Sequence, residues 1–127
     1  EILLSDAEPT VKVEPHLMQQ VVFNLVNNAC QAMVEAGTVT VETTTNQDEE
    51  GREWSIVQVT DTGSGIPNDI IESIFEPFFT TKEKGQGTGL GLSMSQSVIQ
   101  NFGGEIRVTS KVNEGTRFTV RLPVVPL

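Results

Sequence analysis

Residues 16–35 carry apolar side chains at the three- and four-residue spacing of an amphipathic helix. Pro15 suits the first helical position, and Gly37 suits the C′ position beyond the last turn. A helix with one apolar face needs a second layer of structure to cover that face. The apolar positions are Leu17, Val21, Val22, Leu25, Ala29, Ala32 and Met33.

Strand-like segments supply that second layer, because they alternate along the chain and are rich in β-branched residues. The expected strands are Thr10–Val13, Thr38–Thr45, Trp54–Thr60, Glu105–Ser110 and Thr116–Pro123. A second amphipathic helix is expected at Leu90–Phe102, and a short helix capped by Asn68 or Asp69 is expected at residues 68–75. This order predicts a two-layer α/β (α+β) sandwich. Its sheet is mixed but mostly antiparallel, and its helices lie on one face.

Composition limits the classes of protein that fit. The chain has 127 residues with 37% hydrophobic and 20% charged side chains, which predicts one globular domain over residues 1–127. It has neither an apolar run of about 18 residues nor a signal peptide, and its opening EILLSDAEPT predicts a fragment of a longer protein. One cysteine, Cys30, favours a reducing, cytoplasmic location without an internal disulfide. A net charge of −9 argues against nucleic acid as a partner.

The polar face of the first helix is made of amides rather than charges. Gln20, Asn24, Asn28 and Gln31 fall along one stripe of the helix. Asparagine is a poor helix former, so the three at positions 24, 27 and 28 cost helix propensity. Amide oxygens can bind Mg²⁺ without adding negative charge beside a polyphosphate. The residues alone leave a second interpretation open, in which this face is hydrogen-bonded to neighbouring loops.

Two glycine-containing segments follow strand or loop patterns. In DTGSGIP, Asp61 is an acceptor at a strand end, and Gly63 and Gly65 permit close backbone approach to a flat ligand; a simple tight turn is the alternative. In GQGTGLGLS, Gly85–Ser93, four glycines lead into a helix and provide N–H groups for an anion. Their spacing is not that of a Walker A loop.

The only basic residues between Glu53 and Ile106 are Lys82 and Lys84. Lys82 is the candidate for contact with a terminal phosphate, and Lys84 is expected to be solvated. Three phenylalanines, Phe75, Phe78 and Phe79, precede the glycine run and are expected to position it.

Together these segments resemble the GHKL ATPase superfamily, and within it the sensor histidine kinases, most closely those of the nitrogen-regulation type. The four matching segments, in order, are NLVNNACQAM (Asn24–Met33), DTGSGIP (Asp61–Pro67), IFEPFFTTK (Ile74–Lys82) and GTGLGLSMS (Gly87–Ser95). The closing strands through Pro123 also match, so the resemblance covers nearly the whole chain.

The resemblance implies a Bergerat-type fold that binds ATP with Mg²⁺ beneath a flexible lid. Asn28 would ligate Mg²⁺, and Asn24 would lie one turn earlier in the same catalytic site. Asp61 would accept a hydrogen bond from adenine N6, and Gly63 and Gly65 would pass close to the ring. Lys82 would meet the γ-phosphate. The remaining implied nucleotide contacts are Gly87, Thr88, Gly89, Leu90, Gly91 and Thr116.

The implied activity is transfer of the γ-phosphoryl group of ATP to a histidine outside this chain. Asn24 stands where hydrolytic relatives carry a glutamate base, and Gln31 where many relatives carry a cation. The only histidine, His16, opens the first helix and lacks the context of an acceptor. The implied partners are a dimerisation and histidine phosphotransfer domain of the same parent and a response regulator. The fragment is expected to be monomeric, within a homodimeric and membrane-anchored or soluble parent. The alternatives are an anti-sigma-factor-type serine kinase and a non-catalytic nucleotide-binding module.

Overall fold

A computed structural model describes residues 2–3, 15–33, 36–77 and 91–124 of the chain. Its elements are β1 (Ile2–Leu3), α1 (Pro15–Gln31), β2 (Val39–Gln47), β3 (Glu53–Asp61), the 3-10 turn η1 (Ile71–Ser73), α2 (Gly91–Asn101), β4 (Glu105–Lys111) and β5 (Gly115–Pro123). The sheet order is β1-β2-β3-β5-β4. Among the described strands only β1 and β2 pair in parallel, and the remaining neighbours are antiparallel. The predicted mixed, mostly antiparallel sheet is therefore confirmed.

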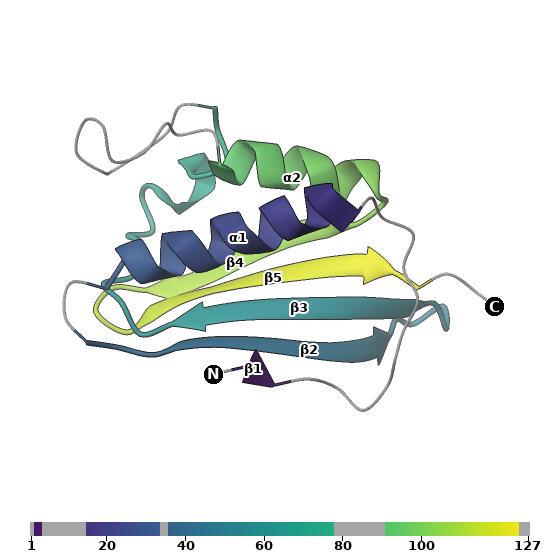
Figure 1. The fold of residues 1–127 in the computed structure, drawn as a ribbon, viewed down its shortest axis with the longest axis horizontal. Helices are drawn as coiled ribbons and strands as arrows, with labels where there is room; N and C mark the ends of the chain where they lie inside the picture. The colour runs from purple at the N-terminus through teal and green to yellow at the C-terminus, as the bar shows by residue number, and fades with distance from the viewer. Residues whose placement is uncertain (1, 4–14, 34–35, 78–90, 125–127) are drawn as a thin grey trace.

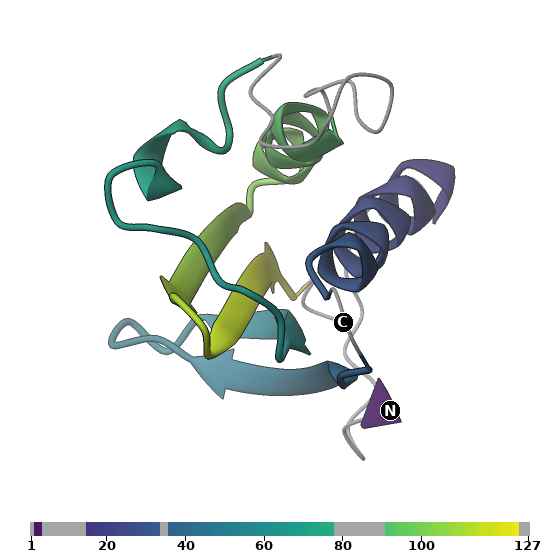
Figure 2. The same cartoon turned by 90° about the vertical axis from the view of Figure 1, so that its left-hand side faces the viewer.

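The two long helices cover one face of the sheet, as Figures 1 and 2 show. Apolar residues of α1 and α2 pack on the inward positions of β3, β4 and β5. The buried core consists of Val21, Leu25, Ala29, Val59, Ile74, Ile99, Ile106, Phe118, Val120 and Leu122. Burying a side chain such as Leu25, which is fully inaccessible, stabilises the fold by roughly 1.5–3 kcal/mol. The predicted apolar positions Val21, Leu25 and Ala29 are thus on the side of α1 that meets the sheet, whereas Leu17 is exposed.

Phe75 connects the segment after η1 to this core. Its ring meets that of Phe118 edge to face, with 6.3 Å between centroids and 86° between planes. The structural role expected for Phe75 agrees with this contact, whereas Phe78 and Phe79 lie outside the described residues.

Several predicted boundaries differ from the structure. The helix α1 ends at Gln31, and its last turn closes through Ala32 N donating to Asn28 O at 3.1 Å. Gly37 is therefore not the C′ residue, because the segment after β3 occupies the end of the helix instead. The expected helix at residues 68–75 is a single 3-10 turn with no side-chain cap, so the predicted caps at Asn68 and Asp69 are wrong. The strand expected at Thr10–Val13 lies outside the described residues, and β1 was not predicted.

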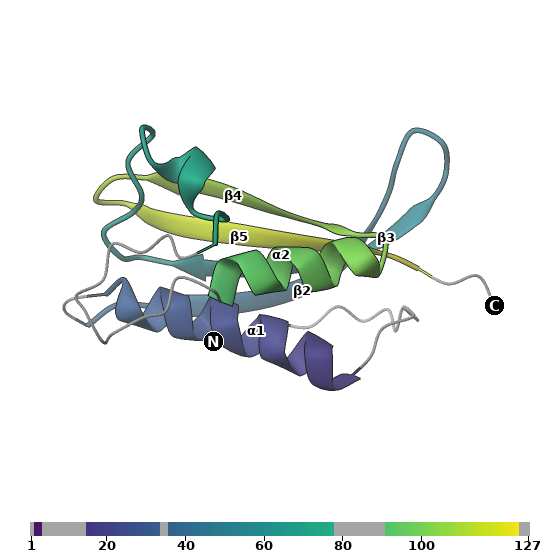
Figure 3. The ribbon, with the colours of Figure 1, turned by 90° about the horizontal axis from the view of Figure 1, so that it is seen from above.

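No helix of the described residues covers the other face of the sheet. Register places Thr60 opposite Arg117, and Ile56 opposite Arg121, on that open face. The β2–β3 hairpin projects away from the rest of the sheet, as Figure 3 shows.

Candidate functional site

The amide stripe of α1 meets the first turn of α2. Asn24 Nδ2 donates to the Gly91 carbonyl at 3.4 Å and to Ser95 Oγ at 3.3 Å. Its Oδ1 accepts from Gln20 Nε2 at 3.3 Å. Ser95 is only 1% exposed, so this contact lies at the packed seam between the two helices. Asn24 therefore holds the residue at which the second glycine segment enters α2.

The same stripe continues toward the segment that follows β3. Asn28 is half-buried, and one turn later the Ala32 carbonyl accepts from Ser64 N at 3.3 Å. Because Asn24, Asn28 and Ala32 are spaced by four residues, they follow one side of the helix. The stripe thus joins the start of α2 at one end to the DTGSGIP segment at the other.

Asp61 ends β3 in a buried position, with 4% of its surface exposed. One carboxylate oxygen, Oδ1, accepts from Gly63 N at 2.8 Å. Among the described residues no other hydrogen bond or ion pair to this carboxylate is formed. A carboxylate has two acceptor oxygens, so the oxygen that Gly63 N does not engage could accept from a ligand amine.

The glycines of DTGSGIP lie against the protein itself. A Cβ on Gly63 would stand 2.7 Å from the Ala32 carbonyl oxygen. Gly65 has φ +76°, and a Cβ there would meet the Lys111 backbone. Only glycine combines this conformation with such close contact. The segment is thereby pressed between the end of α1 and the β4–β5 hairpin, a path visible in Figure 2.

Ser110 links this segment to the sheet, and the sequence analysis missed it. Its Oγ accepts from Ile66 N at 2.7 Å, donates to Gly115 O at 2.9 Å and lies 2.8 Å from Thr116 Oγ1. A serine hydroxyl has one proton. The Ser110 and Thr116 hydroxyls therefore share a hydrogen bond in which either can donate, and Thr116 Oγ1 keeps acceptor capacity in both cases. The sequence signal that could have identified Ser110 is its place on the inward face of β4, where it follows Ile106 and Val108 in alternation.

Five predicted site residues lie outside the described part of the chain: Lys82, Gly87, Thr88, Gly89 and Leu90. Lys84 does too. The predicted residues that are described are Asn24, Asn28, Asp61, Gly63, Gly65, Gly91 and Thr116. They form two groups at opposite ends of the amide stripe, one at Asn24 and Gly91 and one around Asp61.

Comparison with known protein families shows which family this chain matches. The family described as histidine kinase-, DNA gyrase B-, and HSP90-like ATPase matches residues 13–126. The chain belongs to this ATPase family. Membership implies ATP binding by this ATPase domain, and it confirms the predicted superfamily.

Individual relatives of this ATPase domain are sensor kinases. It is 44% identical over 123 residues to the sensor kinase CckA of Brucella abortus, covering 89% of this chain and 13% of that protein. It is 44% identical over 115 residues to the sensor histidine kinase ZraS of Salmonella typhi, covering 91% of this chain and 23% of that protein. The chain therefore spans a quarter or less of the length of these relatives.

Solved structures confirm the fold. The mycobacterial sensor histidine kinase MprB has a TM-score of 0.82 at 27% identity, with 100% of this chain and 83% of that chain covered. Full-length ShkA in complex with AMPPNP has a TM-score of 0.78 at 29% identity, with 100% of this chain and 26% of that chain covered. Both likenesses support the histidine kinase type of ATPase domain. None of the described helices has the length and apolar character needed to span a membrane.

Proposed function

We propose that this ATPase domain binds ATP with Mg²⁺ and transfers the γ-phosphoryl group to a histidine on another domain of a longer sensor kinase. In that reaction the bond between the γ-phosphorus and the β–γ bridging oxygen breaks, and a phosphorus–nitrogen bond to imidazole forms. ADP leaves, and the imidazole nitrogen loses its proton. The observation that carries the proposal is the amide stripe of α1, which runs from the start of α2 to the segment beside Asp61.

The adenine end of the proposed site contains hydrogen-bond acceptors. Asp61 is buried and has one carboxylate oxygen engaged by Gly63 N. Thr116 is also buried, and its hydroxyl lies 2.8 Å from Ser110 Oγ. Adenine offers an N6 amino group as a donor, so Asp61 would accept from it and Thr116 would accept from a water beside the ring. The AMPPNP complex of the similar ShkA chain supports this class of ligand.

The phosphate end contains amides and a helix start. Among the described residues, no group of three His, Cys, Asp or Glu side chains could hold a metal ion. Mg²⁺ in nucleotide enzymes is held by few protein ligands together with substrate phosphates. An amide oxygen from Asn28 fits that donor set, and the N-terminus of α2 at Gly91 favours the phosphate charge. Bound Mg²⁺ would neutralise charge on the transferring group.

Asn24 favours transfer over hydrolysis. Its side chain donates to Gly91 O and Ser95 Oγ, and a neutral amide cannot take a proton from water as a general base. We therefore assign Asn24 to holding the start of α2 beside the phosphates. Lys82 is assigned to the γ-phosphate, and Gly87–Leu90 to wrapping the phosphates.

The proposals for the phosphoacceptor and for the downstream partner are based on the relatives. Because the chain spans 13% of CckA and 23% of ZraS, the parent is proposed to contain further domains. These include a dimerisation and histidine phosphotransfer domain, and the phosphoryl group then passes to a response regulator. The domain itself is proposed to be monomeric and to work in the cytoplasm, within a homodimeric parent.

Labelled ATP tests this function. The chain alone should bind ATP and ADP in titration calorimetry, with tighter ATP binding in Mg²⁺, and should not acquire stable label. Adding the parent's phosphotransfer domain should yield label that is acid-labile, as a phosphorus–nitrogen bond is. Acid-stable label on a serine would support the serine-kinase alternative. Absence of nucleotide binding would contradict the proposal.

A further inference from the structure

Positive charge gathers on the open face of the sheet. Four of the eight lysines and arginines lie on β4 and β5, and they are Arg107, Lys111, Arg117 and Arg121. Register pairs Arg117 with Thr109 and Arg107 with Thr119, so these side chains share the face opposite the helices. With Glu105 and Glu114, residues 105–123 have a net charge of +2, whereas the whole chain has −9.

Arg117 is the least compensated of these cations. Its Nε donates to Thr60 Oγ1 at 3.2 Å, and it makes no ion pair within the described part of the chain. Lys111, with 77% of its side chain exposed, lies 3.6 Å from Glu114. Arg117 and Lys111 border a shallow hollow of about 310 Å³, together with Thr60 and Thr109. Asp61, Ser110 and Thr116 also line this hollow, so it adjoins the strand ends that carry the proposed adenine contacts.

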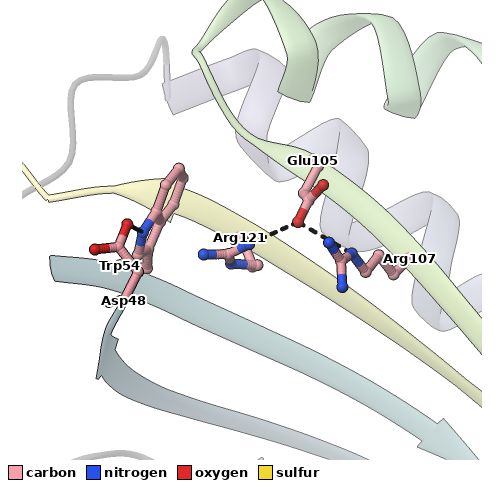
Figure 4. A network of polar contacts seen from close by, with 5 residues as sticks. All are labelled: Asp48, Trp54, Glu105, Arg107 and Arg121. Atoms are coloured by element: carbon pink, nitrogen blue, oxygen red, sulfur yellow. Dashed lines mark hydrogen bonds and ion pairs between the residues drawn. The ribbon is translucent and has the colours of Figure 1, made fainter. Parts of the chain in front are cut away.

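The other end of the open face carries an aromatic and arginine cluster, drawn in Figure 4. The Arg121 guanidinium lies 4.2 Å from the centre of the Trp54 ring. Trp54 Nε1 donates to Asp48 at 3.0 Å. Glu105 accepts from Arg121 at 2.7 Å and pairs with Arg107 at 3.0 Å. These contacts fix the side chains in place, so little conformational entropy remains to be lost on binding.

We infer that the open face of β3, β5 and β4 is a docking surface for a carboxylate-rich surface of a partner protein. Tryptophan and arginine are the residues enriched at the energetic centres of protein interfaces, and both are held here on one face. Arg117 and Lys111 supply charge complementary to carboxylates. A carboxylate of the partner enters the hollow beside Arg117, and Trp54 with Arg121 forms the apolar contact.

Charge selects this occupant over the others. A nucleic acid would meet a chain of net charge −9, which opposes polyphosphate binding in general. A second copy of the chain would have to offer an acidic surface to this face. Such self-association would be recognised because it increases with protein concentration. An acidic partner that presents a few carboxylates is matched by the local net charge of +2 on residues 105–123, and this local complementarity sets its orientation.

Fluorescence anisotropy with a defined probe tests the inference. The probe is a short labelled peptide that repeats Asp-Glu-Gly-Ser, and its control repeats Asn-Gln-Gly-Ser. The acidic peptide should bind the chain more tightly than the neutral one, with affinity falling as salt rises. The double variant Arg107→Gln/Arg117→Gln should weaken binding by about fivefold or more. The matched variant Gln19→Glu/Asn27→Asp, which lowers the net charge by the same two units at exposed positions of α1, should stay within about twofold.

Amide chemical shifts locate the contact. Peptide-induced shifts should fall on β3, β4 and β5. The inference is overturned if both peptides bind equally or if the shifts fall on α1 and residues 62–66. It is also overturned if the Gln19→Glu/Asn27→Asp variant loses the binding. Concentration-dependent self-association abolished by Arg107→Gln/Arg117→Gln would overturn it too, because it would make a second copy the occupant.

Discussion

Asn24 of α1 donates through Nδ2 to the buried hydroxyl of Ser95 on α2, at 3.3 Å. The two residues are far apart in the chain, yet their contact joins the two helices at the point where α2 begins. A polar contact at this packed seam fixes the position of α2 along α1.

Replacing Asn24 with Ala should lower the free energy of unfolding by about 1–2 kcal/mol, because the Ser95 hydroxyl loses its amide partner. Ser95→Ala combined with Asn24→Ala should cost less than the sum of the two single changes. Urea unfolding followed by the fluorescence of Trp54, the single tryptophan, measures both effects. Gln20→Ala serves as the control, since the hydrogen bond from Gln20 to Asn24 is exposed. Strict additivity of the Asn24→Ala and Ser95→Ala effects would contradict the contact between these two residues.

Gly65→Ala should destabilise the domain by about 2 kcal/mol or more, because a Cβ at φ +76° would press on the Lys111 backbone. Gly51→Ala provides a matched control. Gly51 has φ +81°, but no atom lies within 4 Å of its added Cβ. It should therefore show only the conformational cost, about 1 kcal/mol. Thermal unfolding of both variants isolates the contribution of the contact, and equal losses would refute it.

Asp61→Asn should weaken ADP and ATP binding by about tenfold or more while leaving the fold intact. The amide replaces an acceptor with a donor, which cannot pair with an adenine amino group. Titration calorimetry measures the affinity, and circular dichroism checks the fold. Asp69→Asn, an exposed change of the same chemistry, should leave nucleotide affinity unaltered. Unchanged affinity in Asp61→Asn would remove Asp61 from the site.

Asp48 should make the stability of the hairpin pH-dependent. The pKa of Asp48 is lowered, first because Trp54 Nε1 donates to its carboxylate and then because the backbone N–H groups of Arg52 and Glu50 do so. A lowered folded-state pKa gives stability that is present above the unfolded-state value and lost as pH falls through the folded-state value. Unfolding midpoints should therefore fall more steeply below about pH 4 in the native chain than in Asp48→Asn. Identical acid profiles would contradict this assignment.

Periodicity predicted most of the architecture. The stripe from Leu17 to Ala32 gave α1 because an apolar helix face must meet a sheet, and alternation gave β2 to β5 in their observed order. The boundaries that failed depend on tertiary contacts. The helix α1 ends earlier than predicted, where Ser64 N donates to the Ala32 carbonyl. Because this donor lies 32 residues further along the chain, the local sequence could not predict it.

The residues of the candidate site likewise fall into those that the sequence predicted and those that it did not. Residues with distinctive chemistry at a strand or helix end, such as Asp61 and Asn28, could be proposed from sequence, and their roles stay predictions. Ser110 and Ser95 were not, since a small hydroxyl within an apolar pattern is compatible with ordinary packing. Their importance comes from the partners that folding provides, namely Ile66 N, Thr116 and Asn24.

The hydrogen bonds that hold the DTGSGIP segment against β4 and the β4–β5 turn also have a consequence for synthesis at the ribosome. Ser64 O accepts from Asn113 N at 2.7 Å, and Ile66 N donates to Ser110. These anchors are translated long after the segment that they hold. A nascent chain stopped before Asn113 therefore lacks the contacts that hold the proposed adenine site, however complete its first helix and hairpin are. Under the proposed function, nucleotide could assist folding only after the β4–β5 hairpin has left the exit tunnel.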